Sequence, residues 1–207
     1  MTLPVEVKKM GLNKKVDVLT RTGWPEAVGV PISDATVTVK EYGTGPIHKT
    51  IFTCTATPVT ITDVAGTCQY GGITTALYTF PQGLICYLGS VIDGAVTLGV
   101  TGTITATWAG LVSLGTVTAA GDATLTATEA NLLQSTAVAA AVAKVATVDA
   151  ISIATALTES GATWVDGTGT ASALFLNLIV TDEATHTSGT GTFTGTVTVT
   201  WINCGDK

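Results

Sequence analysis

Strict alternation of apolar side chains with threonine is the feature that most constrains this chain. It is clearest in "VTGTITATW" at Val100 to Trp108 and in "FTGTVTVTW" at Phe193 to Trp201, and both stretches end in tryptophan. Successive side chains of a β-strand point to opposite faces, so this period places Val197, Val199 and Trp201 on one face. We expect the two stretches to be facing strands of a sandwich. Their likeness has two explanations, a structural duplication and a threonine-rich composition.

The composition favours the same class. Threonine makes up about one residue in five, and threonine with valine favours strands over helices. Charged residues make up only 12 % of the chain and the mean hydropathy is +0.49. The most apolar stretch, residues 137 to 157, contains Lys144 and Asp149 and falls short of a membrane-spanning helix. The N-terminus, with Glu6 and Lys8, lacks the apolar segment of a signal peptide.

One helical signal interrupts the strands. Thr126-Ala127-Thr128-Glu129 has the spacing of a capping box and leads into Leu132 and Leu133. It predicts one short helix near residues 127-133. The alanine-rich stretch from Thr136 to Ala156 suits both a helix and a strand, and its type stays open.

The chain divides near residue 33. Residues 1-33 show no sustained period and contain Pro4, Pro25 and Pro31, which predicts an extended N-terminal arm. Residues 34-207 are predicted to form an all-β, jelly-roll-like β-sandwich domain. A division of this domain into two subdomains near residue 118 stays open. A turn is expected at Asp93-Gly94.

Side chains that carry chemistry are sparse. Four cysteines stand far apart without the spacing of a zinc or redox site, so free buried thiols are expected, with two disulfides as the alternative. His186 lies beside Asp182 and Glu183, but a solvated turn explains this group better than a metal site. The sequence predicts no catalytic residue, no metal and no cofactor, and the chain is not expected to be an enzyme.

Charge is distributed unevenly. Residues 1 to 49 hold seven basic and five acidic side chains, a net charge of +2, whereas the remainder holds two basic and ten acidic ones, a net charge of −8. Nucleic-acid binding is not expected, because the body is acidic and the basic residues lack interleaved aromatics. Trp24 is expected to anchor the arm on a partner. The predicted partner-binding residues of the arm are Lys8, Lys9, Lys14, Lys15, Arg21 and Trp24.

A surface with few charges is suited to permanent burial in an assembly, because its desolvation costs little. Exposed neutral strand edges are a hazard for a free monomer, which favours a closed homo-oligomer, with a trimer as the expected ring.

The stretches "FPQGLICYLGSVIDGAVTL", "GTVTAAGDATLTATEANLLQST", "LFLNLIVTDEATH" and "TGTVTVTW", between Phe80 and Trp201, resemble structural proteins of tailed-phage virions. Related small proteins decorate or cement capsids, and the resemblance implies a β-sandwich or jelly-roll oligomer clamped over capsid junctions.

We therefore expect a structural virion protein that decorates or cements a bacteriophage capsid. Its expected partners are the major capsid protein and copies of itself, with no direct contact to nucleic acid or membrane. Its expected location is the capsid surface, after assembly in the host cytoplasm. The alternative is a head-fibre, tail or adhesin-like module that binds a host surface glycan.

Overall fold

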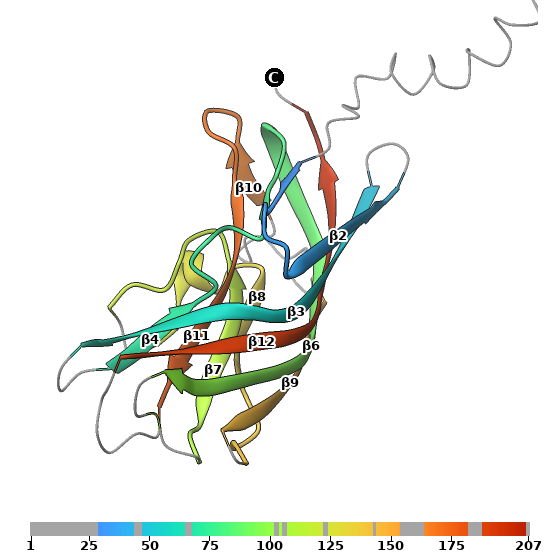
Figure 1. Cartoon of the computed structure of the whole chain (residues 1–207). Helices are drawn as coiled ribbons and strands as arrows, with labels where there is room; N and C mark the ends of the chain where they lie inside the picture. The colour runs from blue at the N-terminus through green and yellow to red at the C-terminus, as the bar shows by residue number, and fades with distance from the viewer. Residues whose placement is uncertain are drawn as a thin grey trace, which may run out of the picture.

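The described part of the chain is almost entirely β-structure. The computed structural model describes residues 29–43, 47–64, 68–101, 104, 107–121, 124–142, 144–153, 164–181 and 188–205. The strands are β1 (Val30–Pro31), β2 (Val37–Tyr42), β3 (Ile47–Val64), β4 (Cys68–Gly72), β5 (Tyr78–Thr79), β6 (Gly83–Thr101), β7 (Gly110–Gly115), β8 (Leu133–Ala137), β9 (Val145–Ile153), β10 (Trp164–Gly167), β11 (Ala173–Val180) and β12 (Gly189–Asn203). They form one 12-stranded antiparallel sheet (Figure 1).

Three long strands organise this sheet. β12 lies between β3 and β6 and is hydrogen-bonded to both along nearly its whole length. At one end β2 extends the sheet beyond β3 and β10 extends it beyond β6. At the other end β4 and β9 take these outer places. We call the end with β2 and β10 the upper end, as it is drawn in Figure 1.

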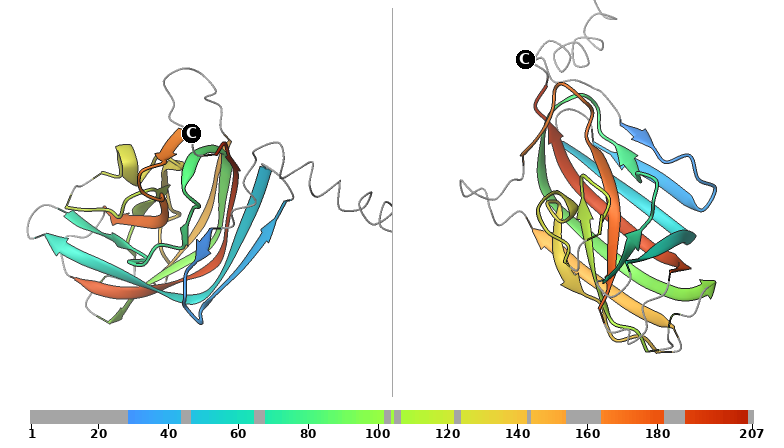
Figure 2. Two further views of the ribbon diagram at one scale, coloured as in Figure 1. Left: turned by 90° about the horizontal axis from the view of Figure 1, so that it is seen from above. Right: turned by 90° about the vertical axis from the view of Figure 1, so that its left-hand side faces the viewer.

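The sheet curls into two layers. β4 is hydrogen-bonded to both β3 and β11, so it carries the sheet from the first layer to the second, where β11 pairs with β7 and β7 with β8. On the opposite side, the amide of Ala139, just after β8, donates to the carbonyl of Thr147 on β9 at 3.1 Å. The two layers, seen from above in Figure 2, confirm the predicted all-β, sandwich-like class.

Alternation builds the core between the layers. Along β12 the inward side chains Phe193, Val197, Val199 and Trp201 are at most 1 % exposed, as the sequence predicts. They pack with inward residues of β3, β6 and β11, such as Phe52, into one large cluster. A smaller cluster of Ala119, Leu125 and Ile179 lies outside it and joins the loop after β7 to β11.

The structure differs from the sequence expectations at several elements. The predicted turn at Asp93-Gly94 is wrong, because both residues lie inside β6. The predicted helix appears as a single 3₁₀ turn, Ala127–Glu129, with the capping box of Thr126 and Glu129, and β8 begins at Leu133. The ambiguous alanine-rich stretch contains the end of β8 and the whole of β9.

The last residues of the predicted arm lie against the body. Val30–Pro31 forms β1 and pairs with β5, and the amide of Ile32 donates to the carbonyl of Leu77 at 3.0 Å. Ile32 also packs against the main core cluster. The path of the chain is therefore fixed from Gly29 onward.

Candidate partner-binding surface

The junction between the arm and the body is built on Tyr78. The six predicted partner-binding residues of the arm, Lys8, Lys9, Lys14, Lys15, Arg21 and Trp24, lie outside the described residues. At the start of the described chain, the amide of Gly29 donates to the hydroxyl oxygen of Tyr78 at 2.7 Å. A β-carbon on Gly29 would collide with the Tyr78 ring, so this close approach requires glycine.

Tyr78 in turn bonds to a partly buried carboxylate. Its hydroxyl donates to Oε2 of Glu41 in β2, and Oε1 of Glu41 lies 2.8 Å from Nδ1 of His48 in β3. Burial raises the pKa of Tyr78, and the hydrogen bond and negative charge of Glu41 raise it further. One chain of contacts thus links the backbone at Gly29 to the first layer of the sheet.

Aromatic packing fixes the inner end of this chain of contacts. The ring of His48 stacks on Trp201, with centroids 4.2 Å apart and planes 11° apart, and the Trp201 indole donates to Oγ1 of Thr50 at 2.9 Å. Phe80 packs edge-on against both Tyr78 and Trp201. The Nε2 atom of His48 is buried and has no hydrogen-bond partner among the described residues.

A row of apolar side chains crosses the outside of the sheet at its upper end. Ile47, Ile202, Cys86 and Trp164 are successive cross-strand neighbours on β3, β12, β6 and β10, and we call them the apolar row. Their strand neighbours point into the core, so the row lies on the outward side of the sheet, where Cys86 is only 4 % exposed. Ile47 is 52 % exposed and Trp164 is 50 % exposed, which leaves both ends of the row open to solvent.

Threonine covers the centre of this outer face. Thr192, Thr194, Thr196, Thr198 and Thr200 alternate along β12 with the inward core residues. The hydroxyl and methyl groups of these side chains give a neutral surface, as the alternation in the sequence predicts.

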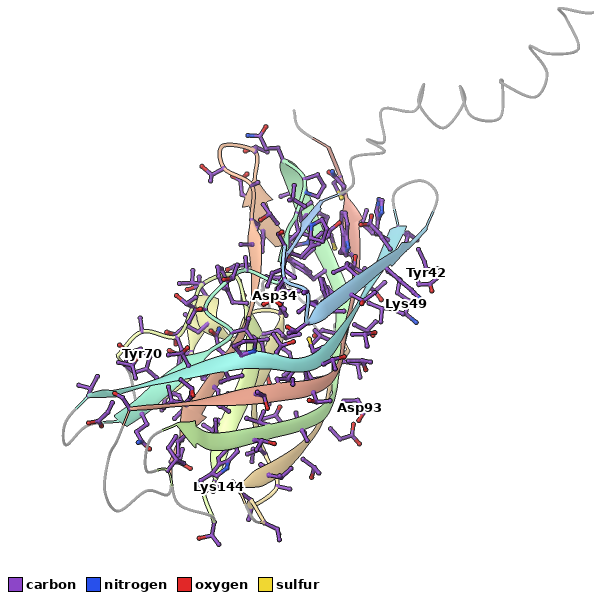
Figure 3. The ribbon with its side chains drawn as sticks, viewed as in Figure 1. Asp34, Tyr42, Lys49, Tyr70, Asp93 and Lys144 are labelled. Carbon is purple, nitrogen blue, oxygen red and sulfur yellow. The ribbon has the colours of Figure 1, made fainter. Side chains whose placement is uncertain are left out.

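Charges lie at the two sides of the outer face. Lys40 in β2 and Lys49 in β3 lie on one side, and Asp93 in β6 and Asp149 in β9 on the other. Asp93 and Asp149 are exposed and directly opposite each other, which is unfavourable for two carboxylates. Figure 3 shows that Tyr42, Lys49 and Asp93 all lie on this outer face of the sheet.

Two free thiols, one of them in the apolar row, lie at the upper end of the sheet. Cys86 is buried beneath the outer face and Cys204 is partly buried, and neither forms a disulfide. Burial raises the pKa of both thiols, and the nearby Cys204 raises the pKa of Cys86 further. Cys54 is also a buried free thiol, in line with the expectation from the sequence.

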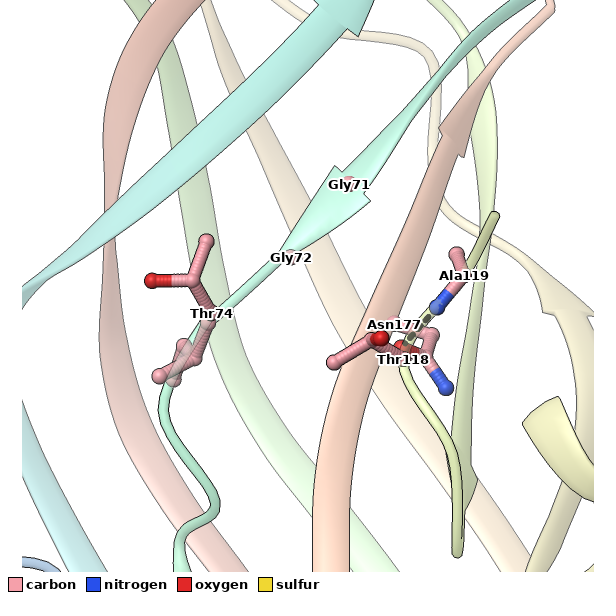
Figure 4. Close-up of a pocket in the computed structure, with 7 residues that line it drawn as sticks. Gly71, Gly72, Thr74, Thr118, Ala119 and Asn177 are labelled. Carbon is pink, nitrogen blue, oxygen red and sulfur yellow. Dashed lines mark hydrogen bonds between the residues drawn. The ribbon is translucent and has the colours of Figure 1, made fainter. Parts of the chain in front are cut away.

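A small pocket lies beside β4 and β11, where Gly72 and Asn177 are among its lining residues. Its volume is about 190 Å³, below the roughly 300 Å³ at which ligand pockets usually begin. The side chain of Asn177, one of its lining residues, accepts a hydrogen bond from the amide of Ala119 (Figure 4). It also donates to the backbone carbonyls of Val117 and Glu129. The polar groups of the Asn177 side chain are therefore already hydrogen-bonded to the backbone and offer little to a ligand.

The described residues contain no metal-binding group. Nowhere among them do three or more histidine, cysteine, aspartate or glutamate side chains stand together in a way that could hold an ion. The group of Asp182, Glu183 and His186 weighed from the sequence lies outside the described residues. In the described ranges, no helix has the length and hydropathy that crossing a membrane requires.

The sequence contained a signal for part of this site. Alternation along Ile47 to Thr53 places His48 on the same face as Phe52, which indicates a buried histidine. The pairing of Glu41 with His48 joins two strands, β2 and β3, and no local pattern indicates it. Tyr78 lies in a two-residue strand that shows no alternation, and no sequence signal indicated its bond to Gly29.

Comparison of the chain with protein-family models, with curated proteins and with solved structures gives no match.

Proposed function

We propose that this chain is a structural protein that decorates or cements the capsid of a bacteriophage. In this role it binds the major capsid protein and copies of itself on the outer surface of the particle, and it catalyses no reaction. It joins the particle in the host cytoplasm, and its work is mechanical: apolar surface buried across capsomer boundaries opposes the pressure of packaged DNA.

The observation that carries this proposal is the outer face of the sheet. Half-exposed apolar side chains lie at its upper end, threonines cover its centre, and the few charges stand at its sides. Such a surface loses little solvation energy when a partner covers it, and its apolar end gains free energy on burial. That role requires no catalytic group.

The junction at Gly29 gives the arm a fixed starting point. Because Tyr78, Glu41 and His48 hold this point against the core, residues 1–28 start from the upper end of the body. We propose that their basic side chains and Trp24 reach the neighbouring capsid protein, where an acidic surface complements them.

Particle stability tests this function. Particles assembled without the protein should release DNA at a lower temperature and after milder osmotic shock than complete particles. Adding the purified full chain should restore the resistance. Equal DNA release from the two kinds of particle, at matched DNA content, rejects the proposal.

A second candidate is a glycan-binding module, and Trp164 is the observation that favours it. Its half-exposed indole face could stack on the apolar face of a sugar. Binding on a glycan array that is lost in Trp164→Ala, with unchanged capsid stability, would favour this candidate over the first.

A further inference from the structure

The upper part of the outer face presents several exposed apolar side chains. Tyr42, Ile47 and Trp164 are 53 %, 52 % and 50 % exposed. Ile202 continues the row from Ile47, and Tyr42 is the cross-strand neighbour of Lys49, next to Ile47 along the strands. Single exposed apolar residues are common, but a group with members on four strands, β2, β3, β12 and β10, indicates an interaction surface.

The pattern of this face is complementary to itself. The apolar row crosses β3, β12, β6 and β10, and its centre lies between Ile202 and Cys86. Basic side chains lie on the β2 and β3 side of that centre, and the carboxylates of Asp93 and Asp149 on the β6 and β9 side. Rotation by 180° about an axis parallel to the strands therefore places the basic side of one copy over the acidic side of another.

We propose that this face binds the same face of a second copy of the chain, around a two-fold axis that runs along the strands between β12 and β6. In this dimer Ile47 of each copy meets Trp164 of the other, and the two rows cover each other. The contact is isologous, so each pair of residues occurs twice. This inference rests on the part of the proposed function in which copies of the chain associate.

The charges complete the contact. Lys40 is in cross-strand register with Ile51, Thr198 and Val91. Along the strands, this position is two residues away from that of the paired Asp93 and Asp149. That separation is roughly 7 Å along the strands, which a lysine side chain can span. In the dimer, Lys40 of one copy can therefore approach Asp149 of the other and relieve the repulsion between the paired carboxylates.

Other occupants fit this face less well. A neutral sugar would cover Trp164 but would leave the charges on both sides without partners. The basic arm would complement Asp93 and Asp149 but would meet Lys40 and Lys49 with like charge. Only a partner with both charge signs, in the reversed order, matches the whole face.

Light scattering on the full chain tests the dimer. The expected mass is that of two chains at micromolar concentration. Ile47→Asp and Trp164→Ala should each raise the dissociation constant at least tenfold, because each removes apolar contact twice per dimer. Val117→Asp is the matched control: Val117 is 45 % exposed but lies on the loop after β7, away from this face. It should leave the mass unchanged, and urea unfolding should show that every variant is folded.

A charge exchange tests the axis itself. Lys40→Glu and Asp149→Lys should each weaken self-association, and an equimolar mixture of the two variants should form a heterodimer that restores it. A monomer, a trimer insensitive to Ile47→Asp, or a mixture without restored association would overturn the two-fold contact. A monomer that still stabilises particles would overturn this inference alone, whereas a dimer that leaves particle stability unchanged would overturn only the proposed function.

Discussion

Tyr78 connects more parts of the molecule than any other described residue at the arm junction. Its hydroxyl accepts from Gly29 and donates to Glu41, and its ring packs against Phe52, Phe80 and Trp201. Both polar contacts are partly buried, so water only partly replaces them when they are lost. The Tyr78 hydroxyl thus acts together with the pairing of β1 and β5 to fix the chain at Gly29.

The variant Tyr78→Phe should unfold more easily. It keeps the ring but leaves the Gly29 amide and one oxygen of Glu41 without their partner, so the free energy of unfolding should fall by about 1–3 kcal/mol. Urea unfolding followed by tryptophan fluorescence measures this. Tyr42→Phe, at an exposed tyrosine, is the matched control and should change stability by less than about 0.5 kcal/mol. Equal effects of the two variants would show that the junction contributes nothing.

Alkaline pH should destabilise the fold through the buried phenols. Burial raises the pKa of Tyr78 and of Tyr87 above the ordinary value of 10.0. A group whose pKa is raised on folding stabilises the folded state fully below its unfolded pKa and loses that contribution as pH rises above it. The free energy of unfolding should therefore decrease above a pH of about 10. A pH series of urea unfolding checks this, and Tyr78→Phe should show a shallower decrease; identical slopes would contradict the assignment.

At the scale of the elements, the long strands depend on places where glycine lets two backbones approach. Gly94 in β6 and Gly195 in β12 are cross-strand neighbours, beside a register shift where β12 also pairs with β3. Gly195 has a φ of 155°, and a β-carbon there would collide with the backbone of Asp93 and Gly94. The sheet therefore continues through this point with no turn.

The variant Gly195→Ala should be destabilised by about 1–3 kcal/mol, because alanine both strains this backbone and collides with β6. Thermal and urea unfolding measure the effect. Gly169→Ala is the control: a β-carbon at Gly169 has open space around it, so a change within about 0.5 kcal/mol is expected. A similar loss in both variants would mean that the close approach is unimportant.

The element scale also shows why alternation predicted so much of the fold. The inward residues of β12 are buried as the period of two requires, and Trp201 lies in the core. The other alternating stretch, Val100 to Trp108, does not form the expected facing strand: β6 ends at Thr101 and is hydrogen-bonded beside β12, and Trp108 is buried but lies outside the described strands. The turn at Asp93-Gly94 failed because a glycine that permits close packing has the same sequence signature as one that permits a turn. The helix prediction was limited for a similar reason: a capping box fixes how a turn begins but does not determine its length.

At the scale of the whole molecule, the site depends on pairings that local patterns do not contain. The alternation shows that Ile47, Ile202 and Cys86 each lie on one face of a strand, but only the register of β3, β12 and β6 brings them into one row. Cross-strand pairing over more than a hundred residues carries no short-range signal. The apolar row and the bond from Gly29 to Tyr78 were therefore beyond sequence reasoning, whereas the all-β class was not.

The most direct test of the central claim is co-sedimentation of the purified protein with phage particles that lack it. We expect the full chain to co-sediment in a fixed ratio to the major capsid protein, and a chain that begins at Gly29 to bind at least tenfold more weakly, although its body stays folded. Saturable binding of this kind would support an assembly protein that attaches through its arm. Failure of the full chain to co-sediment, with the arm intact and the body folded, would contradict the account.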